Sequence, residues 1–352
     1  MFYGIYLPIF LSYIAISVLG LLNLYVFNKD LFIYQLVFFV ISIVLYLLFS
    51  LLPQQFYKKT AFIVYIINLV LLLMVFILGE ITRGSTRWIS LGVVNIQPSE
   101  LIKLTLILVL ALVLTNKTKK YLDLKSFLFS LLVFIPSFIL VFLQPDLGTS
   151  LVLLAIFALL VFYSGVKLSY VATLFLVLAL ASGPIWTNLK DYQKDRIVSF
   201  VNPTLDPLGA GYNALQSQIA IGSGGVFGKG LGAGSQSHLG FLPENTTDFA
   251  FAGFSEEWGV FGSLLLISLY FIILFSLLFL FTSVTNYYSR YIILGVMTVF
   301  WVHVFINIGM NVGIVPVTGI PLPFFSYGGS AFLALSIMLG LVNSVAKHKQ
   351  LI

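Results

Sequence analysis

A chain of 352 residues that is 60% hydrophobic and only 9% charged cannot form the surface of a water-soluble domain, where roughly a quarter of the positions carry charge. Its net charge of +6 requires no nucleic-acid partner if the basic residues lie in cytoplasmic loops, and the absence of cysteine excludes disulfides and thiolate chemistry. The composition predicts a protein whose solvent is largely lipid.

Apolar stretches of about 20 residues, the length that crosses a bilayer as a helix, recur along the whole chain. They predict an all-α polytopic membrane protein with a single domain over 1–352. The eighth stretch is long enough to bend or to extend past the membrane. We expect about ten helices, near 5–27, 31–53, 60–79, 99–116, 126–143, 149–164, 168–187, 249–281, 291–312 and 329–346.

The distribution of basic residues predicts the orientation of these helices. With a cytoplasmic N-terminus, the cytoplasmic segments hold ten of the 18 Lys and Arg residues and one of the 12 acidic residues. Such enrichment is typical of cytoplasmic loops, so both termini are predicted to be cytoplasmic. The first stretch lacks a basic leader and a small-residue cleavage site, so we expect a retained helix and not a signal peptide.

Polar sequence concentrates in the predicted outer segments, the longest of which runs over about 188–247, so we expect any chemistry on the extracytoplasmic face. Within it, GSGGVFGKGLGAGS lacks the spacing of a phosphate-binding loop, because Ser223 occupies the place of the first glycine and Gly230 follows Lys229. We expect these glycines to allow close backbone packing, with direct ligand contact as the alternative.

Acidic residues at the ends of the predicted helices are the first candidates for a site, because a carboxylate in hydrocarbon costs several kcal/mol unless a partner compensates it. Glu100 opens the fourth helix within the sequence Gln97-Pro98-Ser99-Glu100, and Lys103 follows one turn later on the same face. The two form either a structural ion pair or part of a substrate site.

Asp248 begins the eighth helix, where it can cap the helix or carry chemistry. Glu256 and Glu257 lie further along the same helix, too deep to be solvated, so we expect both to have partners.

Two further polar groups complete the candidates. His303, Asn307 and Asn311 recur at helical spacing on the ninth helix, which predicts hydrogen bonds between helices rather than a metal site. Basic residues in the outer segments are interfacial cations when taken singly, but as a group near carboxylates they fit a diphosphate-binding rim. They are Arg83, Arg87, Lys190, Lys194 and Arg196.

The outer segments resemble one known family. The string PVTGIPLPFFSYGGS at 316–330 is similar to the C-terminal signature of the SEDS family (RodA, FtsW and SpoVE), and its first half is more like RodA than FtsW. Four further blocks agree in order, with modest departures at Asn245 and Trp258. These blocks are GSTRWISLGVVNIQPSE, QPDLGTS, DRIVSFVNPTLDP with GYNALQSQIAIGSGGVFGKG after it, and LPENTTDFAFAGFSEEWG.

The resemblance implies a glycosyltransferase in the bacterial cytoplasmic (inner) membrane that polymerises lipid II at its outer face, releases undecaprenyl diphosphate, and serves cell elongation and shape. It also implies a partner, a class B penicillin-binding protein. The family's essential aspartate corresponds to Asp248, and the acid and lysine of its fourth helix correspond to Glu100 and Lys103. Three residues of the matching blocks are further candidates for support or substrate binding: Gln97, Asp146 and Ser326.

The chemistry of this transfer requires a base for the attacking hydroxyl and cations for the departing diphosphate. We therefore expect Asp248 to be the base, Glu100 and Lys103 to orient the acceptor or the site, and Arg83, Arg87 and Arg196 to contact diphosphate or sugar. A divalent cation between carboxylate and diphosphate stays an open alternative, because no ligand cluster in the sequence requires it. A lipid II flippase and a non-catalytic scaffold for a cell-wall synthase are the rival functions.

Overall fold

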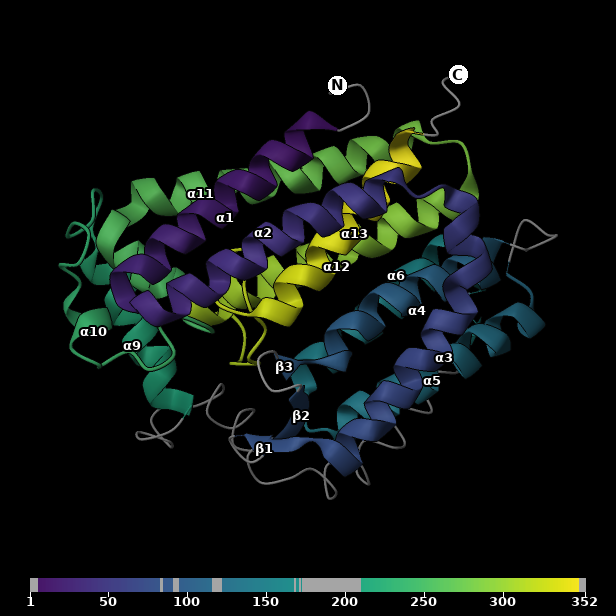
Figure 1. The fold of residues 1–352 in the computed structure, drawn as a ribbon, viewed down its shortest axis with the longest axis horizontal. Helices are drawn as coiled ribbons and strands as arrows, with labels where there is room; N and C mark the ends of the chain where they lie inside the picture. Colours follow the sequence, from purple (N-terminus) through teal and green to yellow (C-terminus); the bar gives the residue numbers. More distant parts are fainter. Residues whose placement is uncertain are drawn as a thin grey trace.

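The computed structural model describes residues 6–82, 85–90, 95–115, 122–167, 169–170, 172 and 210–347. Within these ranges eight helices are long and apolar enough to cross a membrane, and the apolar α6 (Leu147–Tyr163) is shorter. The long helices, shown in Figure 1, are α1 (Leu7–Phe27), α2 (Lys29–Leu51), α3 (Gln54–Leu78), α4 (Pro98–Thr115), α5 (Leu124–Leu143), α11 (Ala250–Ser283), α12 (Tyr287–Val312) and α13 (Gly329–Lys347).

The predicted class, an all-α polytopic membrane protein, is confirmed, and nine of the ten expected spans are helices within six residues of their predicted bounds. The seventh expected span, 168–187, falls almost wholly outside the described residues, so the count of ten stays a prediction.

Capping residues set several helix ends. The Asn28 side chain accepts from the backbone N–H groups of Asp30 and Leu31 at the start of α2, and Gly313 ends α12 in the left-handed conformation.

The eighth expected helix bends, which is one of the two alternatives that its length left open. In α11 the backbone at Gly259 leaves the helical region, with φ 67° and ψ −164°. At 1.5 Å per residue, the stretch from 260 to 283 is roughly 36 Å long and suffices to cross a hydrocarbon core of about 30 Å. The residues before the bend contact Lys229 and His238, so they lie at the end of the molecule that carries α9 (Ala210–Ser223) and α10 (Ser235–His238).

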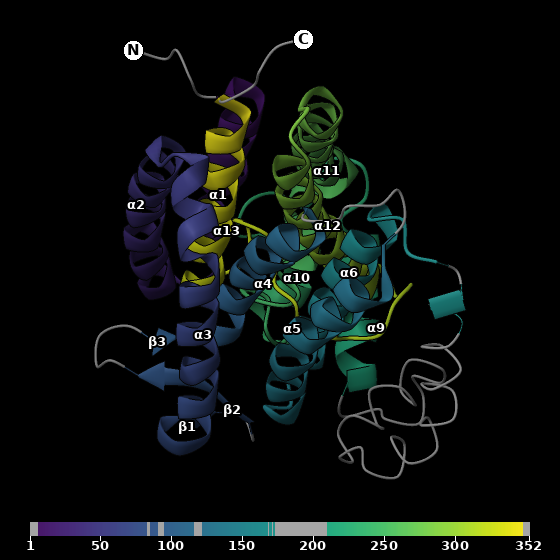
Figure 2. The ribbon, with the colours of Figure 1, turned by 90° about the vertical axis from the view of Figure 1, so that its right-hand side faces the viewer.

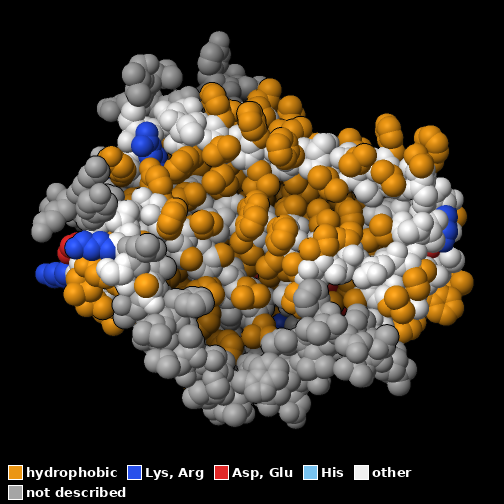
Figure 3. Space-filling view, turned by 180° about the vertical axis from the view of Figure 1, so that it is seen from behind, with side chains coloured by type: hydrophobic (Ala, Val, Ile, Leu, Met, Phe, Trp, Pro, Cys, Tyr) orange, Lys and Arg blue, Asp and Glu red, His pale blue; other side chains and the backbone are white. Residues whose placement is uncertain are grey.

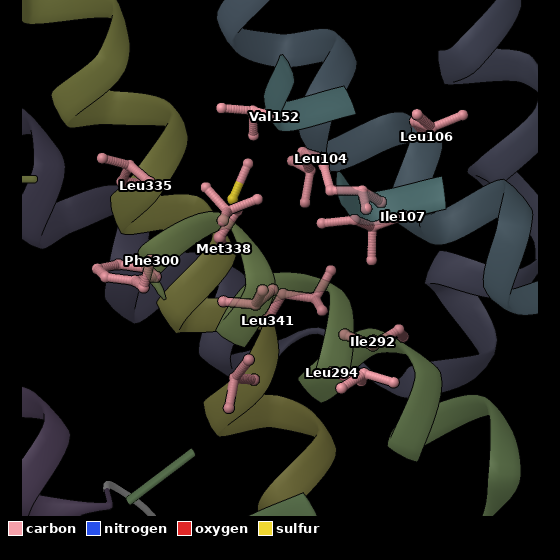
Figure 4. Close-up of a cluster of buried hydrophobic side chains, with 14 of the residues drawn as sticks. Leu104, Leu106, Ile107, Val152, Ile292, Leu294, Phe300, Leu335, Met338 and Leu341 are labelled. Atoms are coloured by element: carbon pink, nitrogen blue, oxygen red, sulfur yellow. The ribbon is translucent and has the colours of Figure 1, made fainter. Parts of the chain in front are cut away.

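The core forms where α4, α6, α12 and α13 meet (Figure 4), and most side chains of α4, α12 and α13 are buried. Peripheral helices, by contrast, expose large apolar side chains such as Ile33, Ile63, Leu132 and Phe271. Figure 3 shows a broad face covered by hydrophobic side chains. Such a surface is stable against acyl chains and not against water.

The start of α1 and the end of α13 lie at one end of the bundle, where the Tyr6 N–H donates to Asn343 Oδ1 at 2.8 Å. This agrees with an even number of crossings. At the other end lie α9, α10 and a sheet in the order β1-β2-β3, as Figures 1 and 2 show. Its antiparallel strands are β1 (Glu80–Thr82), β2 (Ser85–Ser90) and β3 (Asn95–Ile96).

Candidate active site

A buried ion pair opens α4. Glu100 Oε2 and Lys103 Nζ are 2.7 Å apart, one turn from each other, and both side chains are almost wholly buried. The Lys103 ammonium also lies 3.1 Å from Nε2 of His303 on α12. The predicted pairing of Glu100 with Lys103 is confirmed. Sequence reasoning did not connect His303 to this pair, because the two residues are 200 positions apart.

Side chains of α12 hold the loop formed by residues 313–328. His303 Nδ1 lies 3.1 Å from the Pro321 carbonyl oxygen, and Asn307 Nδ2 donates to the Ile320 carbonyl oxygen at 2.8 Å. Two side chains one turn apart on α12 therefore bind two consecutive carbonyl groups of the loop. Buried amide and imidazole groups with such fixed partners restrict the loop strongly.

The same face of α12 fixes the backbone just before α11. Asn307 Nδ2 and Asn311 Nδ2 each lie 3.1 Å from the carbonyl oxygen of Asp248, and Asn311 Oδ1 accepts from the Ala252 N–H at 3.1 Å. The prediction that this polar stripe makes hydrogen bonds between helices is confirmed. It also positions the peptide unit of the predicted base.

The Asp248 side chain is half-buried and borders the 313–328 loop. A Cβ atom added at Gly319, whose φ is +74°, would lie 3.5 Å from Asp248 Oδ2. The Tyr327 N–H donates to the Thr246 carbonyl oxygen at 2.9 Å and so joins the loop to the segment before Asp248. The helix itself begins at Ala250, one residue after its predicted bound of 249 and two residues after Asp248.

A second cluster of polar residues lies around Asp146, at the N-termini of α4 and α6. Its Oδ2 accepts from Gln97 Nε2 and Ser99 Oγ, both at 3.2 Å, and its Oδ1 accepts from the Thr149 N–H at 3.2 Å. Asp146 thus caps α6 and ties its start to α4.

Arg87 on β2 reaches the same turn. Its Nε donates to the Gln144 carbonyl oxygen at 3.3 Å, Nη2 donates to the Pro145 carbonyl oxygen, and Nη1 lies 3.9 Å from Asp146 Oδ1. The guanidinium therefore fixes the 144–146 turn to the sheet. These contacts leave its predicted place on a diphosphate rim untested.

The polar residues around Asp248 and those around Asp146 both lie near the 313–328 loop. A Cβ atom at Gly148, in the first turn of α6, would lie 3.0 Å from the Thr318 carbonyl oxygen and 2.7 Å from Ile320 Cγ1. The loop that borders Asp248 at Gly319 therefore also packs, through Thr318 and Ile320, on the N-terminus of α6. Only glycine allows this close approach.

Ser326 lies within this loop as a buried residue. The Leu322 N–H donates to Ser326 Oγ, and the Ser326 N–H donates to the Leu322 carbonyl oxygen, both at 3.1 Å. Burial raises the pKa of the neighbouring Tyr327 hydroxyl, which therefore stays neutral. The role of Ser326 in substrate binding stays a prediction. Four predicted rim cations lie outside the described residues: Arg83, Lys190, Lys194 and Arg196.

The two deeper acids of α11 do have partners, as predicted. Glu256 Oε1 lies 2.6 Å from Lys229 Nζ and accepts from the Gln236 N–H at 2.9 Å, while Oε2 accepts from the Ser237 N–H at 3.0 Å. Glu257 Oε1 lies 2.7 Å from Nε2 of His238. These contacts anchor the outer segment to the helix.

The glycine-rich stretch packs backbone to backbone against the bend in α11. The N–H groups of Val260 and Phe261 donate to the carbonyl oxygens of Gly225 and Val226 at 3.0 and 3.1 Å. A Cβ atom at Gly228 would overlap the Glu257 carbonyl group. Close backbone packing is therefore confirmed at Gly224 and Gly228, whereas a Cβ atom at Gly222, Gly225, Gly230 or Gly232 would meet no atom within 4 Å.

Among the residues that the structure describes, no three His, Asp or Glu side chains gather in a group that could hold a metal ion.

Comparison with known proteins gives matches along nearly the whole chain. The family model for cell cycle proteins of the FtsW, RodA and SpoVE type matches residues 1–351. The peptidoglycan glycosyltransferase MrdB of Escherichia coli (strain K12) is 39% identical over 313 residues, which cover 88% of this chain and 84% of MrdB. The stage V sporulation protein E of Bacillus subtilis is 36% identical over 274 residues, or 77% and 74% of the two chains.

Solved structures agree with these matches. A chain of a peptidoglycan synthase complex, whose structure concerns the coordination of polymerization and crosslinking, superposes with a TM-score of 0.86 at 31% identity over 99% of both chains. The rod shape determining protein RodA of Thermus thermophilus superposes with a TM-score of 0.75 at 28% identity, again over 99% of each chain.

Proposed function

Because this chain belongs to the FtsW/RodA/SpoVE family, we propose that it polymerises lipid II into glycan strands at the outer face of the cytoplasmic membrane, with Asp248 as the base. It is a peptidoglycan glycosyltransferase, as its relatives MrdB and RodA are named. One observation carries the proposal for the site: α12 fixes the backbone of Asp248, while its half-buried carboxylate borders an outer loop.

The proposed step joins two lipid-linked disaccharides. The 4-hydroxyl of one GlcNAc attacks the anomeric carbon of the lipid-linked MurNAc, and the Asp248 carboxylate accepts the hydroxyl proton. The bond from the anomeric carbon to the diphosphate oxygen breaks with its electron pair, and undecaprenyl diphosphate leaves as an anion. One carboxylate suffices, because a diphosphate leaves without a protein acid when cations stabilise it.

The burial of the Glu100–Lys103 pair favours support of the site over contact with the acceptor. Lys103 bonds to Glu100 and to His303, and His303 reaches the loop that borders Asp248. Arg83 and Arg196 are proposed to contact the diphosphate or sugar, and Arg87 to support them from β2. Gln97, Asp146 and Ser326 are proposed to shape the same face.

The proposed partner is a class B penicillin-binding protein that crosslinks the new strands. Support comes from the synthase complex whose chain superposes on this one over 99% of its length. A role in elongation and cell shape rests on the similarity to MrdB and RodA.

Purified protein incubated with labelled lipid II tests the proposal. We expect the wild-type chain to form glycan strands and Asp248→Ala to form none. Asp30→Ala, which removes an exposed carboxylate at the start of α2, is the matched control and should polymerise normally. A flippase would move lipid II across vesicles without forming strands, and a scaffold would do neither. Unchanged product from Asp248→Ala would remove that residue from the mechanism.

A further inference from the structure

We infer that His303 is a positioning residue for glycosyl transfer, in which a neutral imidazole links the buried Glu100–Lys103 pair to the loop beside Asp248. The inference rests on the proposed function for its reaction, but its geometry is independent of the substrate. It adds a residue from the middle of α12 to a site otherwise built at the outer helix ends.

The partners of His303 define its tautomer. The Pro321 carbonyl oxygen can only accept a hydrogen bond, so the ring nitrogen 3.1 Å away, Nδ1, carries the proton. The Lys103 ammonium can only donate, so Nε2 at 3.1 Å presents its lone pair. A neutral imidazole protonated at Nδ1 satisfies both contacts, and the doubly protonated ring would place two cations in contact.

The imidazole of His303 connects two parts of the site: the Glu100–Lys103 pair on α4 and the loop at Pro321. On one side, Lys103 is held by Glu100 at 2.7 Å. On the other side, the Pro321 carbonyl group is adjacent to that of Ile320, which Asn307 binds at 2.8 Å. Since Asn307 also holds the Asp248 carbonyl group, a shift of the loop at Pro321 changes the wall beside the base.

Simple packing is the competing explanation, because the ring is buried between helices. Packing requires volume, whereas the bridge requires a donor and an acceptor at opposite edges of the side chain. Leucine fills volume but leaves a lysine N–H and a loop carbonyl group without this partner. Glutamine offers an N–H donor and a carbonyl acceptor and cannot be protonated. The two variants therefore separate the explanations.

The experiment measures kcat and KM for labelled lipid II in purified full-length protein. We expect His303→Leu to lower kcat by at least about tenfold with KM within about twofold, because the substrate does not touch the ring. His303→Gln should retain kcat within about threefold of wild type. Thr298→Val is the matched control on α12, since it removes a buried hydroxyl that donates to the Leu294 carbonyl oxygen within the same helix. It should leave kcat unchanged.

Two results would overturn the bridge. One is a His303→Leu variant with the wild-type kcat, and the other is a His303→Gln variant as slow as His303→Leu. If His303→Leu does not fold, the glutamine variant and the next measurement decide. If the wild-type protein forms no glycan, the proposed function fails, and the tautomer alone then decides the bridge.

Nitrogen NMR of protein labelled at histidine reports the tautomer directly. The chain has three histidines, so the signal that disappears in His303→Gln belongs to His303. We expect a protonated Nδ1 and an unprotonated Nε2. Protonation at Nε2 would contradict the inference, because that nitrogen could not then accept from Lys103.

Discussion

Asp248 and Glu256 lie eight residues apart on one stretch of chain, and the two differ in burial and in which group the described contacts fix. At Glu256 the carboxylate itself is fixed. It is fully buried, forms an ion pair with Lys229 and accepts hydrogen bonds from backbone N–H groups of α10. At Asp248 the peptide carbonyl group is fixed by Asn307 and Asn311, and the carboxylate stays half-exposed beside a glycine. A carboxylate saturated with permanent donors stabilises structure, whereas one with a fixed backbone and a solvent-accessible side chain can exchange a proton.

The comparison predicts a large effect of Glu256→Ala on stability alone. The variant removes the acceptor for Lys229, Gln236 and Ser237, which should lower the free energy of unfolding by roughly 3 kcal/mol. Thermal unfolding in detergent should show a lower Tm, with Asp30→Ala as the unchanged control. The folded fraction should retain its kcat. An unchanged Tm would mean that these contacts do not anchor the outer segment.

A pair of glycine variants tests the environment of the Asp248 carboxylate. Gly319→Ala and Gly240→Ala both place alanine at a positive φ, of +74° and +79°, so each should cost roughly 1–2 kcal/mol of stability. Only the methyl group at Gly319 would contact Asp248 Oδ2. We expect kcat to fall about tenfold in Gly319→Ala and to be unchanged in Gly240→Ala. Equal kcat values in the two variants would mean that the loop at Gly319 does not affect Asp248 as the base.

The Arg87→Lys variant tests whether the contacts of Arg87 and Asp146 stabilise the structure, as those of Glu256 do, or take part in the reaction, as Asp248 is proposed to do. Lysine cannot reproduce the forked contact with the Gln144 and Pro145 carbonyl groups, so stability should fall by about 1 kcal/mol. A slightly lower Tm with KM for lipid II within about twofold would indicate support. An unchanged Tm with a strongly raised KM would instead place Arg87 in contact with the substrate.

Hydropathy predicted the spans because lipid-facing helices are apolar over their whole length, and the length of α11 allowed either a bend or an extension past the membrane. It also predicted that Glu256 and Glu257 need partners and that the polar stripe on α12 bonds to other elements. These predictions depend on the free-energy cost of burying a polar group without a partner. The sequence shows directly which polar residues lie within apolar stretches.

Partners distant in sequence could not be predicted in this way. Lys229 was not assigned to Glu256, although a cation in the adjoining outer segment was the available signal. The contact between Lys103 and His303, and that between Arg87 and the 144–146 turn, depend on how the helices pack. The strands of the 80–96 region were also missed. With three and two residues, β1 and β3 are too short to show an alternating pattern, and the six residues of β2, STRWIS, do not alternate between apolar and polar.

The role of Asp248 as the base is tested most directly by measuring lipid II binding and glycan synthesis on the same preparation of Asp248→Asn. Asparagine keeps the size of the side chain and the backbone contacts with α12 but is not a base. We expect the dissociation constant and Tm to match those of wild type while the initial rate of synthesis falls at least about a hundredfold. A variant that binds lipid II and polymerises it at the wild-type rate would contradict this role.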